Sequence, residues 1–351
     1  MSKVKLGSVL AVVACALAVV AAVSQGSAPP RAGKHAPPAV TARDNTLVIY
    51  GNPPPAQIKP VIAAFERANR GVQVRYSDQE DNVSFSKYRA ESAQHARTAD
   101  VIIASSPMNW AQNRGIAARW TPHDVRAFPS FIRQLPGVFV LSPDPAVSLY
   151  NKVKLPANRI PHSFRELEAN VKKYPALFKK KISTYTVDNQ FGYSAFWGLA
   201  KTHGWFGLNL LGPASKPQAD GTAIAKQVLT GGSNFAFFES ALIRSALTGQ
   251  YGKIAGWTYM KDFTPLVPRG VAVTKAAGNP RAARAFVDFM YSAAGQRVMC
   301  AAGFTAFRRG VSCTNSLANV QRAAKTYLVP IGSSIARDHR AFVARWHRVF
   351  R

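Results

Sequence analysis

The chain has 351 residues, of which 47% are hydrophobic and 18% charged, so it can bury a large core and its composition excludes a disordered protein. Its 45 lysines and arginines against 17 acidic residues give a net charge of +28. A surplus of this size is typical of proteins that bind nucleic acids or membrane surfaces. The basic residues are spread along the chain rather than gathered with aromatics into one groove, so we expect no nucleic-acid partner and leave open a merely solvated basic surface.

The N-terminus has the pattern of a secretory signal. Two lysines precede an almost wholly apolar stretch, 6–23, and the small residues that end at Ser24 form a plausible cleavage site. We therefore expect a signal peptide over 1–24, a flexible leader rich in Pro, Ala and Ser over 25–43, and a mature protein in the periplasm. A retained membrane anchor is the alternative, because the apolar stretch is nearly long enough to span a bilayer.

The next residues alternate between strand and helix patterns. The apolar run 46–50 predicts a buried strand, and apolar residues at i, i+3, i+4 and i+7 then predict one face of a helix: Ile58, Val61, Ile62 and Phe65. Residues 72–76 alternate as a strand, 84–94 has a helical composition, and 100–104 is another buried strand. This order predicts an α/β unit with a parallel sheet, in which ligands bind beyond the carboxyl ends of the strands.

The rest of the chain repeats this pattern. Apolar strands are predicted at 137–141, 181–186, 234–238 and 270–274. Ser163 and Glu166 form a capping box that opens a helix, and another helix begins near Asn189. A further helix is predicted to start at Asn279-Pro280, with proline at the first helical position. Its buried face comprises Ala283, Phe286, Val287 and Met290.

Two cysteines remain once the expected signal peptide is removed. Cys300 and Cys313 lie about a dozen residues apart in an exported chain, which indicates one local disulfide. Two buried thiols are the alternative. The sequence contains no C-x-x-C pair, so a zinc ribbon or a thioredoxin-type site has no support.

The sequence has no pattern that indicates catalysis. Its seven histidines do not form a metal-binding spacing such as H-E-x-x-H, and neither a G-x-S-x-G elbow nor a glycine-rich phosphate loop occurs. His123 and Asp124 are neighbours in the chain, but adjacent residues do not orient one another as a catalytic triad requires. We therefore expect a protein that is not an enzyme and that uses no cofactor and no metal.

Several segments, in this order, resemble the family 1 extracellular solute-binding proteins of bacterial ABC importers. They include L-V-I-Y-G-N, A-D-V-I-I-A-S-S and, most specific, V-A-V-T-K-A-A-G-N-P-R-A-A-R-A-F-V-D-F-M-Y-S-A-A-G-Q. The resemblance covers about 46–309 and points to the branch of the ferric-iron-binding periplasmic proteins and their relatives. It implies a two-lobe type II periplasmic-binding-protein fold, with two crossover strands and a central cleft that closes on the ligand.

The resemblance also implies how the chain is divided and what it works with. We expect one lobe from 44–136 with 266–309, and the other from 137–265 with 310–351. The protein would be a monomer that captures a small-molecule ligand and delivers it to an ABC permease in the inner membrane. A ligand-binding sensor that docks on a membrane receptor is the alternative, and the sequence does not separate the two.

The chain departs from the iron-binding relatives at the positions that hold the metal. Where those proteins place adjacent tyrosines, this chain has Ala241-Leu242; where they place a histidine, it has Pro53-Pro54-Pro55; and where they place a carboxylate, it has Ser105-Ser106. Ferric ion needs hard anionic oxygen ligands, which these residues do not supply. A ferric-iron or other cation-binding relative therefore remains only an alternative.

The cleft should be lined from both lobes. We expect ligand contacts from Tyr50, Asn52, Ser105, Ser106, Asn189, Tyr193, Glu239, Ser240 and Tyr259. Each has an ordinary structural alternative: a turn for the serines, a helix cap for Asn189, core packing for the tyrosines and an arginine partner for Glu239. Because hydroxyls, a helix N-terminus and the large positive charge all suit an anion, we expect a small organic anion, phosphorylated or sulfonated.

Overall fold

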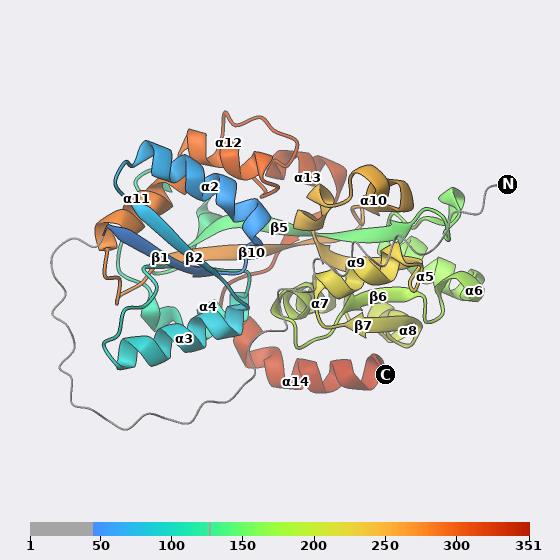
Figure 1. The fold of residues 1–351 in the computed structure, drawn as a ribbon. Helices are drawn as coiled ribbons and strands as arrows, with labels where there is room; N and C mark the ends of the chain where they lie inside the picture. Colours follow the sequence, from blue (N-terminus) through green and yellow to red (C-terminus); the bar gives the residue numbers. More distant parts are fainter. Residues whose placement is uncertain (1–44, 126–127) are drawn as a thin grey trace, which may run out of the picture. The chain divides into compact units, whose positions relative to one another are not determined.

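The computed structural model describes residues 45–125 and 128–351 (Figure 1). The predicted signal peptide 1–24, its cleavage near Ser24 and the leader 25–43 lie outside these residues. In the part of the chain that the structure describes, no helix has the length and hydrophobicity needed to cross a membrane.

The first half of the sheet is built from the N-terminal residues, as the alternating pattern predicted. Strands β1 (Thr46–Gly51), β2 (Gln73–Asp78) and β3 (Val101–Ala104) run parallel in the order β2-β1-β3. Helix α2 (Pro55–Ala68) buries Ile58, Val61 and Phe65, the apolar face that the spacing predicted. Helix α3 (Asp81–Ala93) begins three residues before the predicted start at Ser84.

The second half of the sheet comes from the middle of the chain. Strands β6 (Ile182–Tyr185) and β7 (Ser215–Gln218) are parallel to one another, and β8 (Phe235–Ser240) runs parallel to β6. Strand β9 (Ala255–Thr258) pairs with β5 beside them. The helices of this half are α5 (Phe164–Lys173), α6 (Pro175–Phe178), α7 (Gln190–His203), α8 (Phe206–Ala214), α9 (Gly221–Leu229) and α10 (Gly249–Ile254).

Two long strands cross from one half to the other. Strand β5 (Val138–Asn151) pairs with β10 (Thr264–Val273) at its beginning and with β8 and β9 at its end. The predicted strand 137–141 was therefore too short, because β5 continues through Pro143 and Pro145. Pro143 faces Pro268 of β10, so ladder hydrogen bonds are missing where the two strands cross. This topology confirms the α/β fold with two crossover strands (Figure 1).

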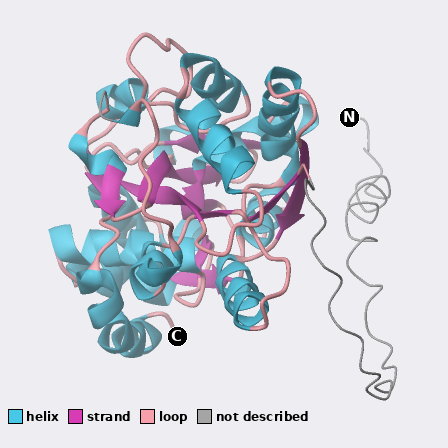
Figure 2. Cartoon of the chain, turned by 90° about the vertical axis from the view of Figure 1, so that its left-hand side faces the viewer, coloured by secondary structure: helices cyan, strands magenta, loops and turns pink. Residues whose placement is uncertain are grey.

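The buried apolar residues form two large clusters on opposite sides of the crossover. One is centred on β1, β3 and α2 together with α11 (Pro280–Tyr291) and α12 (Ala293–Ala301), and it contains the predicted face of α11. The other is centred on β6, β8 and α7, and the C-terminal helix α14 (Ser333–Val349) contributes to it. Figure 2 shows helices on both sides of the strands.

The remaining elements connect these clusters. They are α4 (Pro107–Gln112), β4 (Arg133–Leu135), α13 (Leu317–Ala323) and β11 (Thr326–Leu328). The predicted disulfide is present: Cys300 in α12 is bonded to Cys313, with Cα atoms 6.5 Å apart. It fastens the segment before α13 to the end of α12.

Candidate functional site

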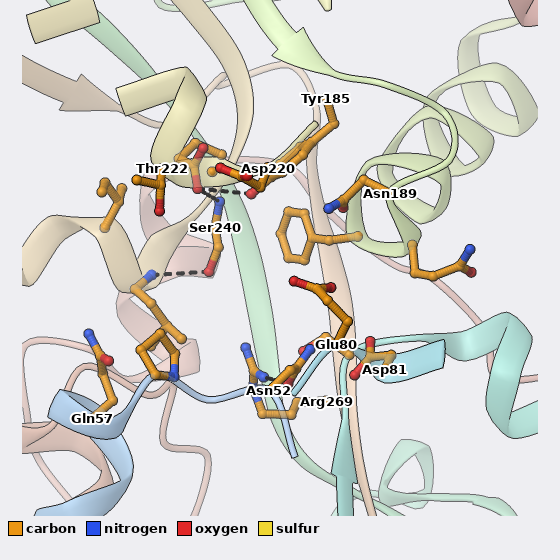
Figure 3. Close-up of a pocket in the computed structure, with 18 of the residues that line it drawn as sticks. Asn52, Gln57, Glu80, Asp81, Tyr185, Asn189, Asp220, Thr222, Ser240 and Arg269 are labelled. Atoms are coloured by element: carbon orange, nitrogen blue, oxygen red, sulfur yellow. Dashed lines mark hydrogen bonds between the residues drawn. The ribbon is translucent and has the colours of Figure 1, made fainter. Parts of the chain in front are cut away.

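A cavity of about 290 Å³ lies where the carboxyl ends of strands from both halves meet (Figure 3). One side is formed by residues after β1, β2 and β3 and by Arg269 on β10. The opposite side is formed by the ends of β6 and β8 and by the first residues of α7 and α9. The first side contributes Asn52, Pro54, Gln57, Glu80, Asp81, Ser105 and Arg269; the second contributes Tyr185, Asn189, Gln190, Phe191, Asp220, Gly221, Thr222, Glu239, Ser240, Leu242, Ile243 and Ala246.

Asp81 opens helix α3 on the first side of the cavity and is almost completely buried. Burial raises the pKa of its carboxyl to about 7; Arg269 opposes this rise and Glu80 adds to it. Burial likewise raises the pKa of Glu80, with Asp220 and Asp78 contributing. On the first side, Asp81 is thus partly protonated near neutral pH.

Glu239 is the corresponding group on the second side, at the end of β8. Its Oε1 accepts hydrogen bonds from the Tyr185 hydroxyl, at 2.9 Å, and from the backbone N–H of Ser240, at 3.0 Å. Its other oxygen, Oε2, is buried without a hydrogen-bond partner among the described residues. Burial raises the pKa of Glu239 to about 8, although both hydrogen bonds lower it.

Local backbone geometry fixes the position of Glu239. The preceding residue, Phe238, has a φ of 67°, which is strained for a non-glycine residue and is typical of functional sites. At the start of α9, a Cβ on Gly221 would lie 2.5 Å from Glu239 Oε1 and 2.8 Å from the Tyr185 hydroxyl oxygen. A glycine is therefore needed there for this pair of side chains to keep its place.

Arg269 connects the cavity to the crossover strands. Its guanidinium forms a buried ion pair with Asp144 of β5, at 3.2 Å, and donates a hydrogen bond to the side-chain oxygen of Asn52. Asp144 also accepts a 2.6 Å hydrogen bond from the Ser240 hydroxyl. The Nε of Arg269 is buried and has no partner within the described part of the chain.

Five of the nine predicted contact residues line the cavity: Asn52, Ser105, Asn189, Glu239 and Ser240. All but Ser105 are already engaged: the Asn52 side-chain oxygen accepts from Arg269, and Glu239 Oε1 accepts from Tyr185 and from Ser240 N. The side-chain oxygen of Asn189 caps α7 by accepting from Gly192 N, at 3.1 Å, and the Ser240 hydroxyl is held by Asp144. The Ser105 hydroxyl is buried and without a hydrogen-bond partner among the residues that the structure describes. It is thus left available to a ligand.

The other four predicted residues do not line the cavity. Tyr50 is buried and donates its hydroxyl to Glu91 at 2.8 Å, and Tyr193 is fully buried with its hydroxyl on the carbonyl of Ile335. Tyr259 accepts a hydrogen bond from Arg244 at 2.7 Å. Ser106 caps α4 and donates to the Gln190 side chain at 3.1 Å, so it joins the two sides of the molecule beside the cavity. Tyr50 in β1 and Tyr193 in α7 pack inward, and Tyr259, half-buried after β9, is engaged by Arg244.

The sequence reasoning missed most of the charged lining. It named neither the acidic pair Glu80 and Asp81, nor Asp220, nor Arg269. The acidic run 78–81 directly follows β2, so the rule that placed ligand contacts after β1 and β3 would have found the pair. Arg269 lies in the middle of a strand and gave no comparable signal.

Two properties of the lining bear on its chemistry. Among the cavity residues in the described part of the chain there are four carboxyl groups and one guanidinium. Several buried polar atoms of this lining have no partner within that part, and acceptors predominate: Gln57 Oε1, Asp81 Oδ1, Ser105 Oγ, Glu239 Oε2 and Arg269 Nε. No group of three or more His, Cys, Asp or Glu side chains in 45–125 and 128–351 is arranged to hold a metal ion.

Comparison with solved structures shows the same fold in proteins of low sequence identity. The substrate-binding protein of an ABC transporter from Agrobacterium tumefaciens is 22% identical, with a TM-score of 0.79 over 87% of this chain and 95% of that one. Iron-bound HitA from Pseudomonas aeruginosa is 19% identical, with a TM-score of 0.70 over 86% and 99%. AfuA from Actinobacillus pleuropneumoniae, with exogenous fructose-6-phosphate bound, is 18% identical, with a TM-score of 0.69 over 87% and 98%.

A comparison with curated proteins finds no match. The family described as bacterial extracellular solute-binding protein matches residues 51–297, which is more than half of the chain. Together with the two-lobe fold of the solved structures, this confirms the predicted family and fold. The chain belongs to the bacterial extracellular solute-binding proteins.

Proposed function

We propose that this protein captures a small organic cation that carries several N–H or O–H donors and delivers it to an inner-membrane permease. One observation carries this proposal: the cavity presents buried, unpartnered acceptor oxygens from both sides, Asp81 Oδ1 and Glu239 Oε2 among them. Ammonium or hydroxyl groups of a ligand placed against these oxygens would supply the missing hydrogen bonds, and charge-assisted bonds of this kind are about twice as strong as neutral ones.

The lining gives less support to the organic anion that the sequence suggested. An anion would face four carboxyl groups, and the one guanidinium of the lining, that of Arg269, is already paired with Asp144. The net charge of +28 does not decide the matter, because charges on the surface are screened over about 8 Å at physiological ionic strength. The carboxyl groups in the cavity are close to the ligand and shielded from salt.

Protonation and ligand binding are expected to be linked in this cavity. With pKa values near 7 and 8, Asp81 and Glu239 keep a proton for part of the time at neutral pH when the cavity is empty. A bound cation favours the ionised form of both groups and thereby expels protons. Affinity for a cation should therefore rise with pH across this range, whereas affinity for an anion should fall.

The remaining features of the proposal follow from the family and the sequence. We propose export with cleavage near Ser24, action in the periplasm as a monomer, and capture without catalysis. We divide the lobes as 44–136 with 266–309 and 137–265 with the C-terminal residues. The disulfide and the packing of Leu317 against Leu266 and Phe131 favour adding α13 to the first lobe. A sensor that docks on a receptor would use the same cavity.

Calorimetric titration tests the ligand class. The probes are 1,4-diaminobutane, choline and glucosamine as cations, fructose 6-phosphate as an anion, and ferric citrate as a metal source. We expect binding of a cationic probe and a loss of about tenfold or more in Glu239→Gln, from the roughly 1.5–3 kcal/mol of a charge-assisted hydrogen bond. Asp188→Asn, an exposed carboxyl outside this cavity, is the matched control and should bind normally. Tight binding of fructose 6-phosphate or ferric ion alone would reject the proposal.

A further inference from the structure

The C-terminal helix α14 carries a stripe of arginines on its exposed side. Its apolar residues Ile335, Phe342 and Trp346 are buried against the second cluster. The exposed basic residues follow one another at helical spacing on the opposite side: Arg337, Arg340, Arg345, Arg348 and, just beyond the helix, Arg351. At about 100° per residue they fall within one sector, and at about 1.5 Å per residue they extend over roughly 20 Å.

Lysines at the end of α5 and directly after α6 extend this stripe. Lys172, Lys173, Lys179 and Lys180 are all exposed. The Nζ of Lys180 donates to the carbonyl of Arg351 at 2.8 Å, which joins the lysines directly to the end of the arginine stripe. We call the nine residues Arg337, Arg340, Arg345, Arg348, Arg351, Lys172, Lys173, Lys179 and Lys180 the basic face.

Aromatic rings lie among these charges. Arg345 stacks over the Trp205 ring at 4.4 Å, and Lys172 lies 5.8 Å from the ring of Phe206. Phe206 is 73% exposed, although it is a large hydrophobic side chain at the start of α8. An exposed aromatic beside cations is an arrangement that favours the interface between water and lipid headgroups.

The nearby acidic groups do not neutralise the basic face. Asp338 is held by Lys201 at 2.8 Å and by Arg337 at 3.6 Å, and Glu168 lies beside Lys172 and Arg165. Several cations therefore remain exposed to solvent, and the Arg337 side chain itself is 75% exposed. These exposed cations make up part of the net charge of +28, and none of them lines the ligand cavity.

We propose that the basic face binds the anionic phospholipid surface of the membrane in which the importer is embedded. The face would hold the protein near its permease by many weak contacts, each basic residue near an anionic surface contributing about fivefold to partitioning. We commit to a lipid surface because the exposed ring of Phe206, next to these cations, can insert at the boundary between headgroups and acyl chains. The proposal is independent of the ligand, since no residue of the basic face lines the cavity.

Vesicle sedimentation tests this proposal. Exported protein is mixed with phosphatidylcholine vesicles with or without phosphatidylglycerol, at low and high salt. The test variant replaces four residues of the basic face by glutamine: Lys172, Lys173, Arg340 and Arg348. The matched control removes the same charge from exposed positions on the other cluster: Lys59, Arg70, Arg119 and Arg284. All proteins share one N-terminus, so any contribution from that segment cancels.

We expect wild type to bind only the vesicles that contain phosphatidylglycerol and to dissociate at high salt. The test variant should lose more than a hundredfold in partitioning, and the control variant less than tenfold. Phe206→Ser should lose several-fold without any change in charge. Equal losses in the test and control variants would show a non-specific effect of net charge and would overturn the proposal. The proposal would also be overturned if wild type did not bind the vesicles, and this includes the case in which it binds an acidic protein instead.

Discussion

Glu239 keeps its place through a small set of neighbours at atomic contact distance. The Tyr185 hydroxyl and the Ser240 N–H hold one carboxyl oxygen, and Gly221 leaves room for both side chains. The sequence identified Glu239 and Ser240 from their place at a strand end, but it gave no sign of Tyr185 or Gly221. These two are visible only once the fold brings β6, β8 and α9 together.

Replacing Gly221 by alanine should therefore damage the site specifically. The added Cβ would lie 2.5 Å from Glu239 Oε1, so the carboxyl must move, and we expect ligand affinity to fall by about tenfold or more. Gly115→Ala, where nothing lies within 4 Å of the added carbon, is the control. Calorimetric titration measures the affinity, and circular dichroism confirms the fold. Unchanged affinity in Gly221→Ala would contradict the described geometry.

The buried carboxyl groups also predict how stability depends on pH. The pKa of Asp81 is raised from 3.8 to about 7 and that of Glu239 from 4.5 to about 8, so the empty folded protein holds protons that the unfolded chain releases. Their contribution to the free energy of unfolding is complete below about pH 4 and is lost as pH rises through 7 to 8. For Asp81 the loss amounts to at most about 4 kcal/mol.

Urea unfolding of the empty protein at several pH values measures this effect. Wild type should become less stable between about pH 5 and about pH 8, and the double variant Asp81→Asn, Glu239→Gln should lose most of that slope. Asp188→Asn should behave as wild type. A wild-type curve that is flat, or that rises over this range, would show that these carboxyl groups are ionised in the empty cavity.

At the scale of elements, the crossover strands β5 and β10 carry a buried ion pair beside the cavity. Asp144 and Arg269 face one another with less than a tenth of either side chain exposed. The sequence predicted part of each strand, 137–141 of β5 and 270–274 of β10, and missed the segments that cross between the two halves. Strand β5 continues because its neighbour also carries prolines at the crossing, so few hydrogen-bonding groups are left unpaired.

Removing one member of this pair should be costly. Arg269→Met leaves Asp144 buried without its cation, which typically costs about 3–5 kcal/mol. The double variant Asp144→Leu, Arg269→Met removes both charges and should recover much of that loss. Urea unfolding of the two variants at neutral pH provides the comparison. If the single variant were as stable as wild type, the pair would not be desolvated as described.

The disulfide belongs to the same scale, because it fastens the segment before α13 to α12. It closes a loop with a sequence separation of 13, for which chain entropy predicts about 3 kcal/mol. We expect the double variant Cys300→Ser, Cys313→Ser to lose about 2–3 kcal/mol, and reduced wild type to match it. Denaturant unfolding with and without reductant measures both. Equal stability of oxidised and reduced wild type would contradict this expectation.

For the whole molecule, the order of strand and helix patterns predicted the α/β architecture and the family, which the fold and the family match confirm. The ligand class was harder to predict, because it depends on side chains from separate segments of the chain that meet only in three dimensions. The net charge of +28 suggested an anion, yet the residues of the basic face are exposed and lie away from the cavity. Acidic residues after β2, at Asp220 and at Glu239 determine the charge of the lining instead.

The central claim is that the cavity carboxyl groups bind a cation and release protons as they do so. Calorimetric titration of wild type with its best cationic probe, at about pH 6 and about pH 8 in buffers of different ionisation enthalpy, tests it most directly. We predict affinity that rises by about tenfold or more over this range, with net proton release that is lost in Asp81→Asn, Glu239→Gln. Affinity that falls with pH, or proton uptake on binding, would contradict the account and point to an anion.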